Sequence, residues 1–201
     1  MASKIIGGSL RGQRVAALPR GIFARPILAR IKKSLFDILK TRITESNFLD
    51  LFSGSGSVGL EAASRGAKKV VFIDANPQCQ KWIENTLKRL SEKNELFLRQ
   101  ARCEVYRADV LSGLAWLSEE FNIIFSGAPY KDEKKRPLFF VGDVLDIIER
   151  DRVLAEGGLF IAQHHNKETI RVPSGWDFYR QEQYGDSVLS FFRQLKYVRK
   201  N

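Results

Sequence analysis

The sequence predicts an α/β fold with a mostly parallel sheet, preceded by a small basic β-hairpin. From residue 47 onward, short apolar runs alternate with segments of helical periodicity, which is typical of a parallel sheet with helices on both faces. A glycine-rich turn at residues 54–59 separates the first apolar run from the first helical segment. The first fifteen residues instead show glycine-punctuated turns.

The expected elements follow one another in the order of such a sheet. Apolar runs predict buried strands at residues 48–52, 70–73, 104–107, 122–125 and 159–162. Helices are expected at about 60–65, 80–90, 111–117 and 138–150. Two further runs, 178–183 and 188–194, flank Tyr184-Gly185-Asp186 and predict a closing hairpin that adds an antiparallel edge strand.

The N-terminal segment is expected to form a basic arm. Residues 4–15 resemble two short strands around Gly7-Gly8 and Gly12. Arg25-Pro26 interrupts the chain, and an amphipathic basic helix is expected at residues 27–39, with Ile31 and Leu35 at helical spacing. We therefore place an N-terminal basic β-hairpin arm at residues 1–25 and the main domain at residues 26–201.

The amino-acid composition limits the classes of protein to which this chain can belong. The 201 residues are 44% hydrophobic and 28% charged, which suits a globular domain better than a disordered chain. No apolar run approaches the roughly 20 residues that cross a bilayer, and no signal-peptide stretch follows Met1, so we expect a cytoplasmic protein. Cys79, Cys103, His164 and His165 lack metal-ligand spacing, so no metal is expected.

The net charge of +10 makes nucleic acid the leading partner class, because surplus Lys and Arg attract phosphate backbones through counterion release. A solvated basic surface explains the charge equally well, so the placement of the cations has to decide. The candidate phosphate contacts lie on the arm and the first helix: Arg11, Arg14, Arg25, Arg30, Lys32 and Lys33.

Residues 50–59 predict a nucleotide-type cofactor site. Their GxGxxG pattern between a strand and a helix lets the backbone turn tightly and approach a ligand. A dinucleotide would place its pyrophosphate there, but Asp50 would put negative charge beside it. S-adenosylmethionine suits the turn better, because it has no phosphate and carries an ammonium and a sulfonium. The expected contacts are Asp50, Phe52, Gly54, Ser55, Gly56 and Gly59.

Two later strand ends support this cofactor. Asp74, followed by Ala75, stands at the offset expected of a ribose-binding carboxylate. Asp109 closes the third strand, where its carboxylate can accept a hydrogen bond from an adenine amine while Val110 packs beside the ring. Each aspartate alone is as well explained as a helix cap. Three carboxylates at successive strand ends, beside a glycine-rich turn, favour the cofactor site.

A set of motifs spread over the chain forms a specific combination: Ile5-Ile6-Gly7-Gly8 with Arg11-Gly12, Arg25-Pro26, residues 50–59, Ser64-Arg65-Gly66-Ala67, and Tyr184-Gly185-Asp186 with Ser190-Phe191-Phe192-Arg193. Through these motifs nearly the whole chain resembles the RsmD family of bacterial methyltransferases. The resemblance implies a Rossmann-like class I S-adenosylmethionine-dependent methyltransferase sheet of seven strands and an RNA-contacting N-terminal hairpin. It implies methyl transfer from S-adenosylmethionine to the exocyclic amine of a guanine in small-subunit ribosomal RNA.

The chain departs from that family where the chemistry would occur. Family members carry Asp-Pro-Pro-Tyr after the fourth strand, and this chain has Gly127-Ala128-Pro129-Tyr130. The delocalised amine of a base is a poor nucleophile that needs hydrogen-bond acceptors, and Gly127 offers no side chain. Backbone carbonyls around Ala128 and Pro129 remain as acceptors, and Tyr130 remains to stack on a flipped base.

Two more departures lie elsewhere in the chain. Gln163 stands where the family commonly has Glu, and polar family positions after residue 26 are occupied by Ile27, Leu28, Ala29 and Lys33. Two functions stay open: an RNA N-methyltransferase with slow or altered turnover, and an RNA-binding or ribosome-assembly protein that retains the cofactor pocket. The expected partner is ribosomal RNA or a small-subunit assembly particle, and a monomer is expected. An oxidoreductase is disfavoured by the acidic strand end, and a small-molecule methyltransferase leaves the basic arm unexplained.

Overall fold

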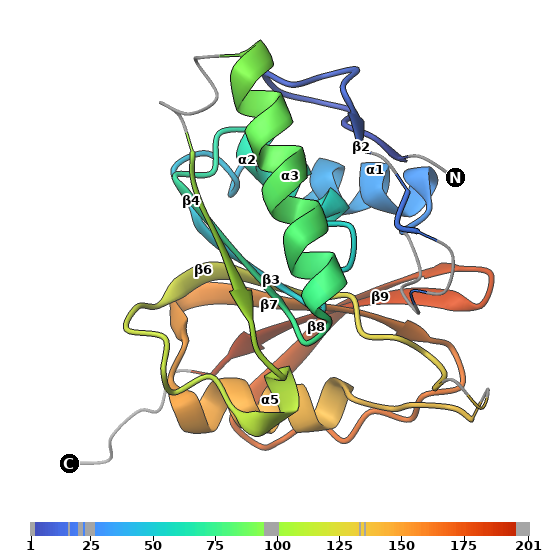
Figure 1. Ribbon diagram of the computed structural model, residues 1–201. Coiled ribbons are helices and arrows are strands. Elements are labelled where there is room, and N and C mark those ends of the chain that lie inside the picture. Colours follow the sequence, from blue (N-terminus) through green and yellow to red (C-terminus); the bar gives the residue numbers. More distant parts are fainter. Residues whose placement is uncertain are drawn as a thin grey trace.

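The computed structural model describes residues 3–15, 17–19, 22, 27–94, 101–132, 134 and 136–195. A seven-stranded sheet has helices on both faces, and a separate two-stranded sheet lies beside it (Figure 1). The predicted α/β fold with an N-terminal hairpin is confirmed. The expectation for Arg25 lies outside the described residues.

The large sheet has the order β5-β4-β3-β6-β7-β9-β8. Its strands are β3 (Asn47–Leu51), β4 (Lys69–Asp74), β5 (Arg102–Arg107), β6 (Phe121–Ser126), β7 (Leu154–His165), β8 (Trp176–Tyr184) and β9 (Ser187–Gln194). Strands β3 to β7 pair in parallel, whereas β9 is antiparallel to both of its neighbours. The closing hairpin is therefore present as predicted, with the antiparallel strand β9 inside the sheet and β8 at its edge.

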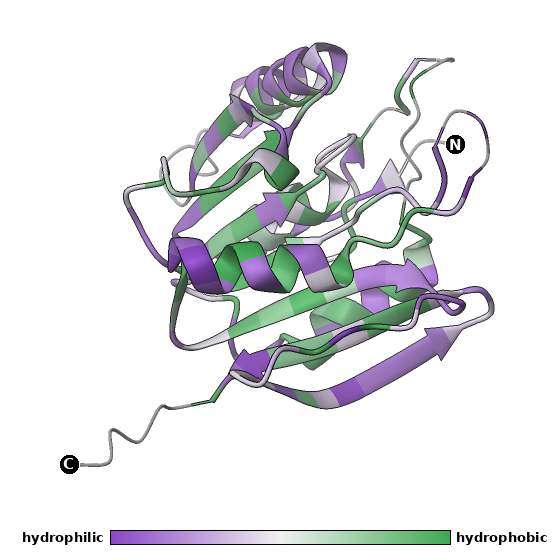
Figure 2. Cartoon of the chain, turned by 90° about the horizontal axis from the view of Figure 1, so that it is seen from below, coloured by the Kyte–Doolittle hydropathy of each residue, from purple (hydrophilic) through white to green (hydrophobic). Residues whose placement is uncertain are grey.

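Helices cover the two faces unequally. Helices α1 (Ala29–Ile38), α2 (Ser57–Ser64) and α3 (Pro77–Lys93) pack on one face, and α5 (Val141–Asp151) packs on the other with the 3₁₀ turn η1 (Val110–Ser112). The inner strands are mostly hydrophobic, whereas α3 is largely hydrophilic (Figure 2). The helix expected at residues 111–117 is wrong, because Gly113 takes a φ of 108° and ends η1 after three residues.

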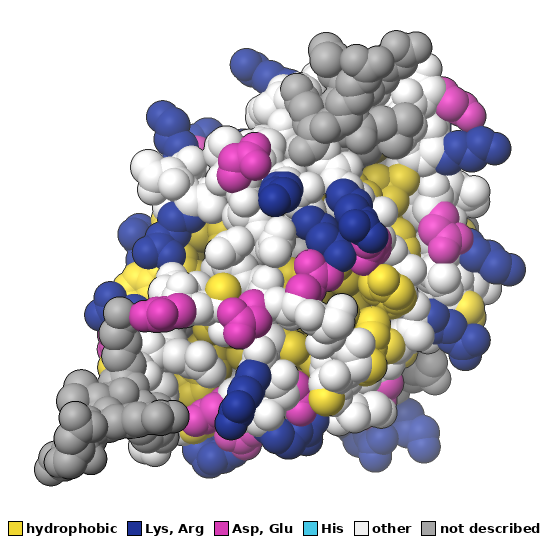
Figure 3. Space-filling model, turned by 90° about the vertical axis from the view of Figure 1, so that its left-hand side faces the viewer, with side chains coloured by type: hydrophobic (Ala, Val, Ile, Leu, Met, Phe, Trp, Pro, Cys, Tyr) yellow, Lys and Arg dark blue, Asp and Glu magenta, His cyan; other side chains and the backbone are white. Residues whose placement is uncertain are grey.

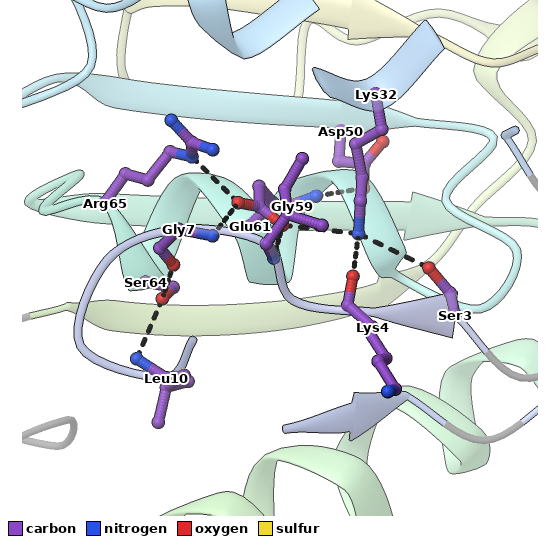
Figure 4. Close-up of polar contacts among 11 residues, drawn as sticks. Ser3, Lys4, Gly7, Leu10, Lys32, Asp50, Gly59, Glu61, Ser64 and Arg65 are labelled. Carbon is purple, nitrogen blue, oxygen red and sulfur yellow. Dashed lines mark hydrogen bonds and ion pairs between the residues drawn. The ribbon is translucent and has the colours of Figure 1, made fainter. Parts of the chain in front are cut away.

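The N-terminal hairpin is held against α2 by side chains of that helix. Its strands are β1 (Ser3–Lys4) and β2 (Arg14–Val15), and Ile5 and Leu10 between them are buried in the core. The carboxylate of Glu61 accepts hydrogen bonds from the backbone N–H groups of Ile6 and Gly7 at 2.9 and 2.8 Å. Figure 4 shows Glu61 between the hairpin and α1.

Lys32 also contacts the carboxylate of Glu61. This contact corrects the expectation that Lys32 faces RNA phosphates. Its side chain is 0% exposed, its Nζ lies 3.3 Å from Glu61 Oε2, and it donates to the backbone oxygen of Lys4 at 2.7 Å. Burial lowers the pKa of Lys32, and the carboxylate of Glu61 opposes that shift. Lys32 therefore ties α1 to the hairpin and is not available to a ligand at the surface.

We predict that Glu61→Gln lowers the free energy of unfolding by about 3 kcal/mol, because breaking a buried ion pair leaves the partner's charge uncompensated. Urea denaturation followed by circular dichroism measures the change. Glu92→Gln, an exposed position on α3, is the matched control and should change stability by less than about 0.5 kcal/mol. A loss below about 1 kcal/mol for Glu61→Gln would show that the contact is not a stabilising clamp.

Candidate functional site

A cavity of about 330 Å³ opens at the carboxyl ends of the parallel strands, the edge at which α/β sheets usually bind ligands. It is lined by segments that follow β3, β4, β5 and β6 and by parts of the chain before α1 and α5. Its residues include Leu18, Ile27, Phe52, Ser53, Ser55, Ala75, Asn76, Leu111, Leu138 and Phe140. A larger hollow of about 850 Å³ lies between the end of α1 and the start of β7. None of the predicted site residues that the structure describes lines that hollow.

The turn after β3 has the backbone that the glycine motif predicts. Gly54 and Gly56 take φ values of 54° and 72°, and Phe52 takes 55°, a conformation unusual for a residue with a side chain. The amide of Gly54 donates to Asp74 Oδ2 at 2.8 Å, so β4 helps to hold the turn. The ring of Phe52 stacks on Phe140 with centroids 6.0 Å apart.

The later glycines of the motif shape the turn without lining the cavity. A Cβ atom at Gly59 would lie 2.3 Å from Cε1 of Phe72, so glycine lets α2 approach β4 closely. A Cβ at Gly56 would lie 3.0 Å from a side-chain carbon of Ile83 on α3. Both glycines were expected to contact a cofactor, and in the structure both are packing positions.

Three carboxylates converge on the cavity. Asp50 is 1% exposed and accepts a hydrogen bond from the amide of Gly59 at 2.8 Å. Asp74 accepts from the amides of Gly54 and Asn76, and Asp109 accepts from the amide of Leu111. All three line the cavity, and no Lys or Arg of the described residues does so.

Burial governs the protonation of the deepest carboxylate. Loss of water around Asp50 raises its pKa to about 8, and repulsion from the nearby Asp74 adds to the shift, although the bond from Gly59 opposes it. An ionised Asp50 therefore needs a positive partner. The described residues supply none in the cavity, so the site favours a ligand that brings its own positive charge.

One residue that was expected to contact the cofactor, Val110, does not line the cavity, and the next residue in the chain does. Val110 is 1% exposed and packs in the core beneath the sheet, and Leu111 lines the cavity instead. The expectation that Val110 packs on a ligand ring is therefore corrected. Asp109 acts as the N-cap of η1, and this short turn decides which side chain faces the cavity.

The other part of the cavity is formed by residues 127–130 after β6, which include Ala128 and Pro129. The amide of Gly127 donates to the backbone oxygen of Leu51 at 3.1 Å, which holds this segment beside the turn after β3. Tyr130 is 8% exposed, and its hydroxyl accepts a hydrogen bond from Nε2 of Gln163 at 3.0 Å. The ring of His165 meets Tyr130 edge-on, with centroids 5.8 Å apart.

The other predicted cations divide between two surfaces. Arg11 and Arg14 are exposed on the hairpin, and Arg30 and Lys33 are exposed on α1. The ammonium of Lys33 pairs with Asp37 at 2.6 Å. On the face where β5 forms the sheet edge, Lys and Arg side chains are interspersed with Asp and Glu side chains around exposed hydrophobic ones (Figure 3).

The described residues contain neither a membrane-spanning helix nor a cluster of metal ligands. No helix there is long and apolar enough to span a membrane. No group of three or more His, Cys, Asp or Glu side chains in that part of the chain is placed to hold a metal ion.

Known proteins resemble this chain along nearly its whole length. Ribosomal RNA small subunit methyltransferase D of Escherichia coli K12 is 26% identical over 192 residues, which cover 95% of this chain and 89% of that protein. The protein of the same name from Haemophilus influenzae is 28% identical over 190 residues, covering 90% and 89%.

Solved structures show the same fold. The structure of yhhF from Escherichia coli has a TM-score of 0.77 at 24% identity and covers 96% of this chain and 98% of that one. The rRNA methyltransferase aviRa of Streptomyces viridochromogenes has a TM-score of 0.62 at 14% identity, with 88% of each chain covered. The family model described as Conserved hypothetical protein 95 matches residues 3–193. Because this match spans nearly the whole sequence, the chain belongs to that family, which is the RsmD family that its motifs resemble.

Proposed function

We propose that this chain is an S-adenosylmethionine-dependent methyltransferase of ribosomal RNA, and that its target is an exocyclic amine, guanine N2 of the small-subunit RNA. The observation that carries the proposal is a single cavity that both the three carboxylates and residues 127–130 line. A methyl donor and an acceptor base can thus meet in one place. Relatives that cover most of the chain are named as ribosomal RNA methyltransferases.

The residues of the cavity fit the proposed donor. S-adenosylmethionine supplies a transferable methyl group and positive charge, and the buried Asp50 provides the matching negative charge. Asp74 accepts two backbone hydrogen bonds, and a carboxylate has about four lone-pair sites, so capacity remains for ribose hydroxyls. Asp109 and Leu111 line the part suited to an adenine ring.

The acceptor base would be handled by residues 127–130. Tyr130 is positioned by Gln163 and His165, so its ring can set the plane of a base that enters the cavity. Backbone carbonyls of this segment are the hydrogen-bond acceptors for the amine, because position 127 has no side chain. Orientation without a side-chain acceptor supports slow transfer, since a positioned proton-handling group contributes about 10²–10⁴ in rate.

A second candidate function rests on the same glycine. An RNA-binding or ribosome-assembly protein with a retained cofactor pocket needs no acceptor at Gly127 and would keep the rest of the cavity. Both functions require binding of S-adenosylmethionine and RNA. Only transfer of a methyl group distinguishes them.

For the donor site, we predict that Asp74→Ala raises the Kd for S-adenosylmethionine about tenfold or more, because a hydrogen bond to a charged group contributes about 1.5–3 kcal/mol. Isothermal titration calorimetry measures the change. Asp143→Ala, an exposed aspartate on α5, is the matched control and should leave the Kd unchanged. Equal affinity of Asp74→Ala and the parent would remove Asp74 from the donor site.

Binding of the donor should depend on pH through Asp50. Its carboxyl is protonated below its pKa of about 8, and a cationic ligand favours the ionised form, so binding releases a proton. Affinity should therefore rise between pH 6 and pH 8, by at most about tenfold per pH unit, and level off above pH 8. Asp50→Asn removes the rise and reports any titration of the ligand itself. A parent affinity that stays flat over this range, after subtraction of that control, contradicts the assignment.

For catalysis, restoring the family's acidic motif should speed transfer. Gly127→Asp with Ala128→Pro should raise the single-turnover rate about 10²-fold, with little change in RNA affinity. The new Cβ would lie 3.2 Å from Cε1 of Phe125, so that ring must shift by a few tenths of an ångström. Gly127→Ala with Ala128→Pro is the matched control, since it repeats the backbone change without a carboxylate. Equal rates for the two double variants would show that a missing carboxylate does not limit this protein.

A further inference from the structure

The hairpin and helix α3 form one continuous surface. Strand β2 lies beside α3 (Figure 1), and Nη2 of Arg89 on α3 donates to the backbone oxygen of Arg14 at 2.7 Å. Nδ2 of Asn94, which follows the helix, approaches the backbone oxygen of Ser9 at 3.5 Å. The contact through the Arg14 carbonyl leaves the Arg14 side chain exposed. Helix α3, which was not among the segments expected to contact RNA, thus packs beside the hairpin.

This surface carries positive charge with little acid to offset it. Residues 3–15 include Lys4, Arg11 and Arg14 and no Asp or Glu, and all three cations are exposed. Helix α3 adds four cations, Lys81, Lys88, Arg89 and Lys93, and two carboxylates, Glu84 and Glu92. The three lysines among these cations are exposed. Within the described part of the chain, none of the three lysines takes part in an ion pair.

Helix α3 also runs in a direction that suits the binding of an extended RNA strand. It begins at Pro77, directly after its N-cap Asn76, which lines the cavity, and it ends beside the hairpin. Its 17 residues correspond to about 25 Å at roughly 1.5 Å per residue. At about 3.4 Å per nucleotide step, that length matches roughly seven steps of a nucleic-acid strand.

The first helix contributes less cationic surface than its sequence suggests. Lys32 is buried against Glu61, and Lys33 is paired with Asp37, so Arg30 is the candidate on α1 that has neither restriction. The lysines of α3 have no such partners within the described residues. Charge and position therefore favour α3 over α1 as the continuation of the hairpin surface.

We propose that α3 and the hairpin form a phosphate-binding track for the RNA that flanks the target base. This track consists of Arg11 and Arg14 with Lys81, Lys88, Arg89 and Lys93. It leads from the cavity rim along α3 to the hairpin, so a base in the cavity would have its neighbouring backbone held by these cations. The inference rests on the proposed function, since it takes RNA as the substrate.

The test compares two double charge reversals. Lys88→Glu with Lys93→Glu changes two exposed positions of the track, and Lys40→Glu with Arg152→Glu makes the same net charge change at exposed positions at the ends of α1 and α5. Binding to small-subunit ribosomal RNA is measured over a range of salt concentrations. For the track variant we expect the Kd to rise about tenfold at 0.15 M salt and the salt slope to fall by about 1.4–1.8, or about 0.7–0.9 per lost contact. The control should stay within about twofold of the parent.

Donor binding and thermal unfolding serve as folding controls, and RNA binding by the parent distinguishes failure of the track from failure of the proposed function. Both variants should bind S-adenosylmethionine and unfold thermally as the parent does, which excludes a folding defect. If the parent binds the RNA and the track variant loses no more affinity than the control, the track is overturned and the proposed function stands. If the parent binds no RNA at all, the track and the proposed function both fail.

Discussion

The buried carboxylate of Glu61 is the contact around which one face of the molecule is arranged. It accepts hydrogen bonds from two backbone N–H groups of the hairpin and pairs with Lys32 from α1 and with Arg65, the C-cap of α2. Helix α2, which carries Glu61, begins at the glycine turn of the cavity and donates the Gly59 amide to Asp50. One short helix therefore sets both the cofactor turn and the position of the arm. Charges buried this deeply are tolerated only when each is paired and hydrogen-bonded.

The cavity and the hairpin surface carry opposite charges, and this difference explains which ligand suits which surface. The cavity has three carboxylates and no described cation, whereas the hairpin has exposed cations and no carboxylate in residues 3–15. Under the proposed function, a cationic donor would bind in the cavity and a polyanionic RNA would bind on the hairpin surface. The net charge of +10 would then attract RNA, while the carboxylates would keep phosphate out of the cavity.

Much of the fold could be predicted from the sequence because its signals are local. Apolar runs marked the strands, and the glycine turn located the cavity between β3 and α2. The errors arose where a distant partner decides the outcome. Lys32 shares the helix face of Leu35 and Phe36, which hinted at burial, but its partner Glu61 is 29 residues away. Leu111 lines the cavity in place of the expected Val110 because of the short η1 turn, and hydrophobic periodicity does not predict such a turn.

The proposed function requires that the cavity brings a methyl donor to an amine of RNA. The most direct measurement is incubation of the parent protein with small-subunit ribosomal RNA and S-adenosylmethionine labelled in its methyl group, followed by digestion of the RNA to nucleosides. We predict slow appearance of label in N2-methylguanosine. Binding of both ligands without any label in the RNA would contradict it and would leave an RNA-binding protein with a retained donor pocket.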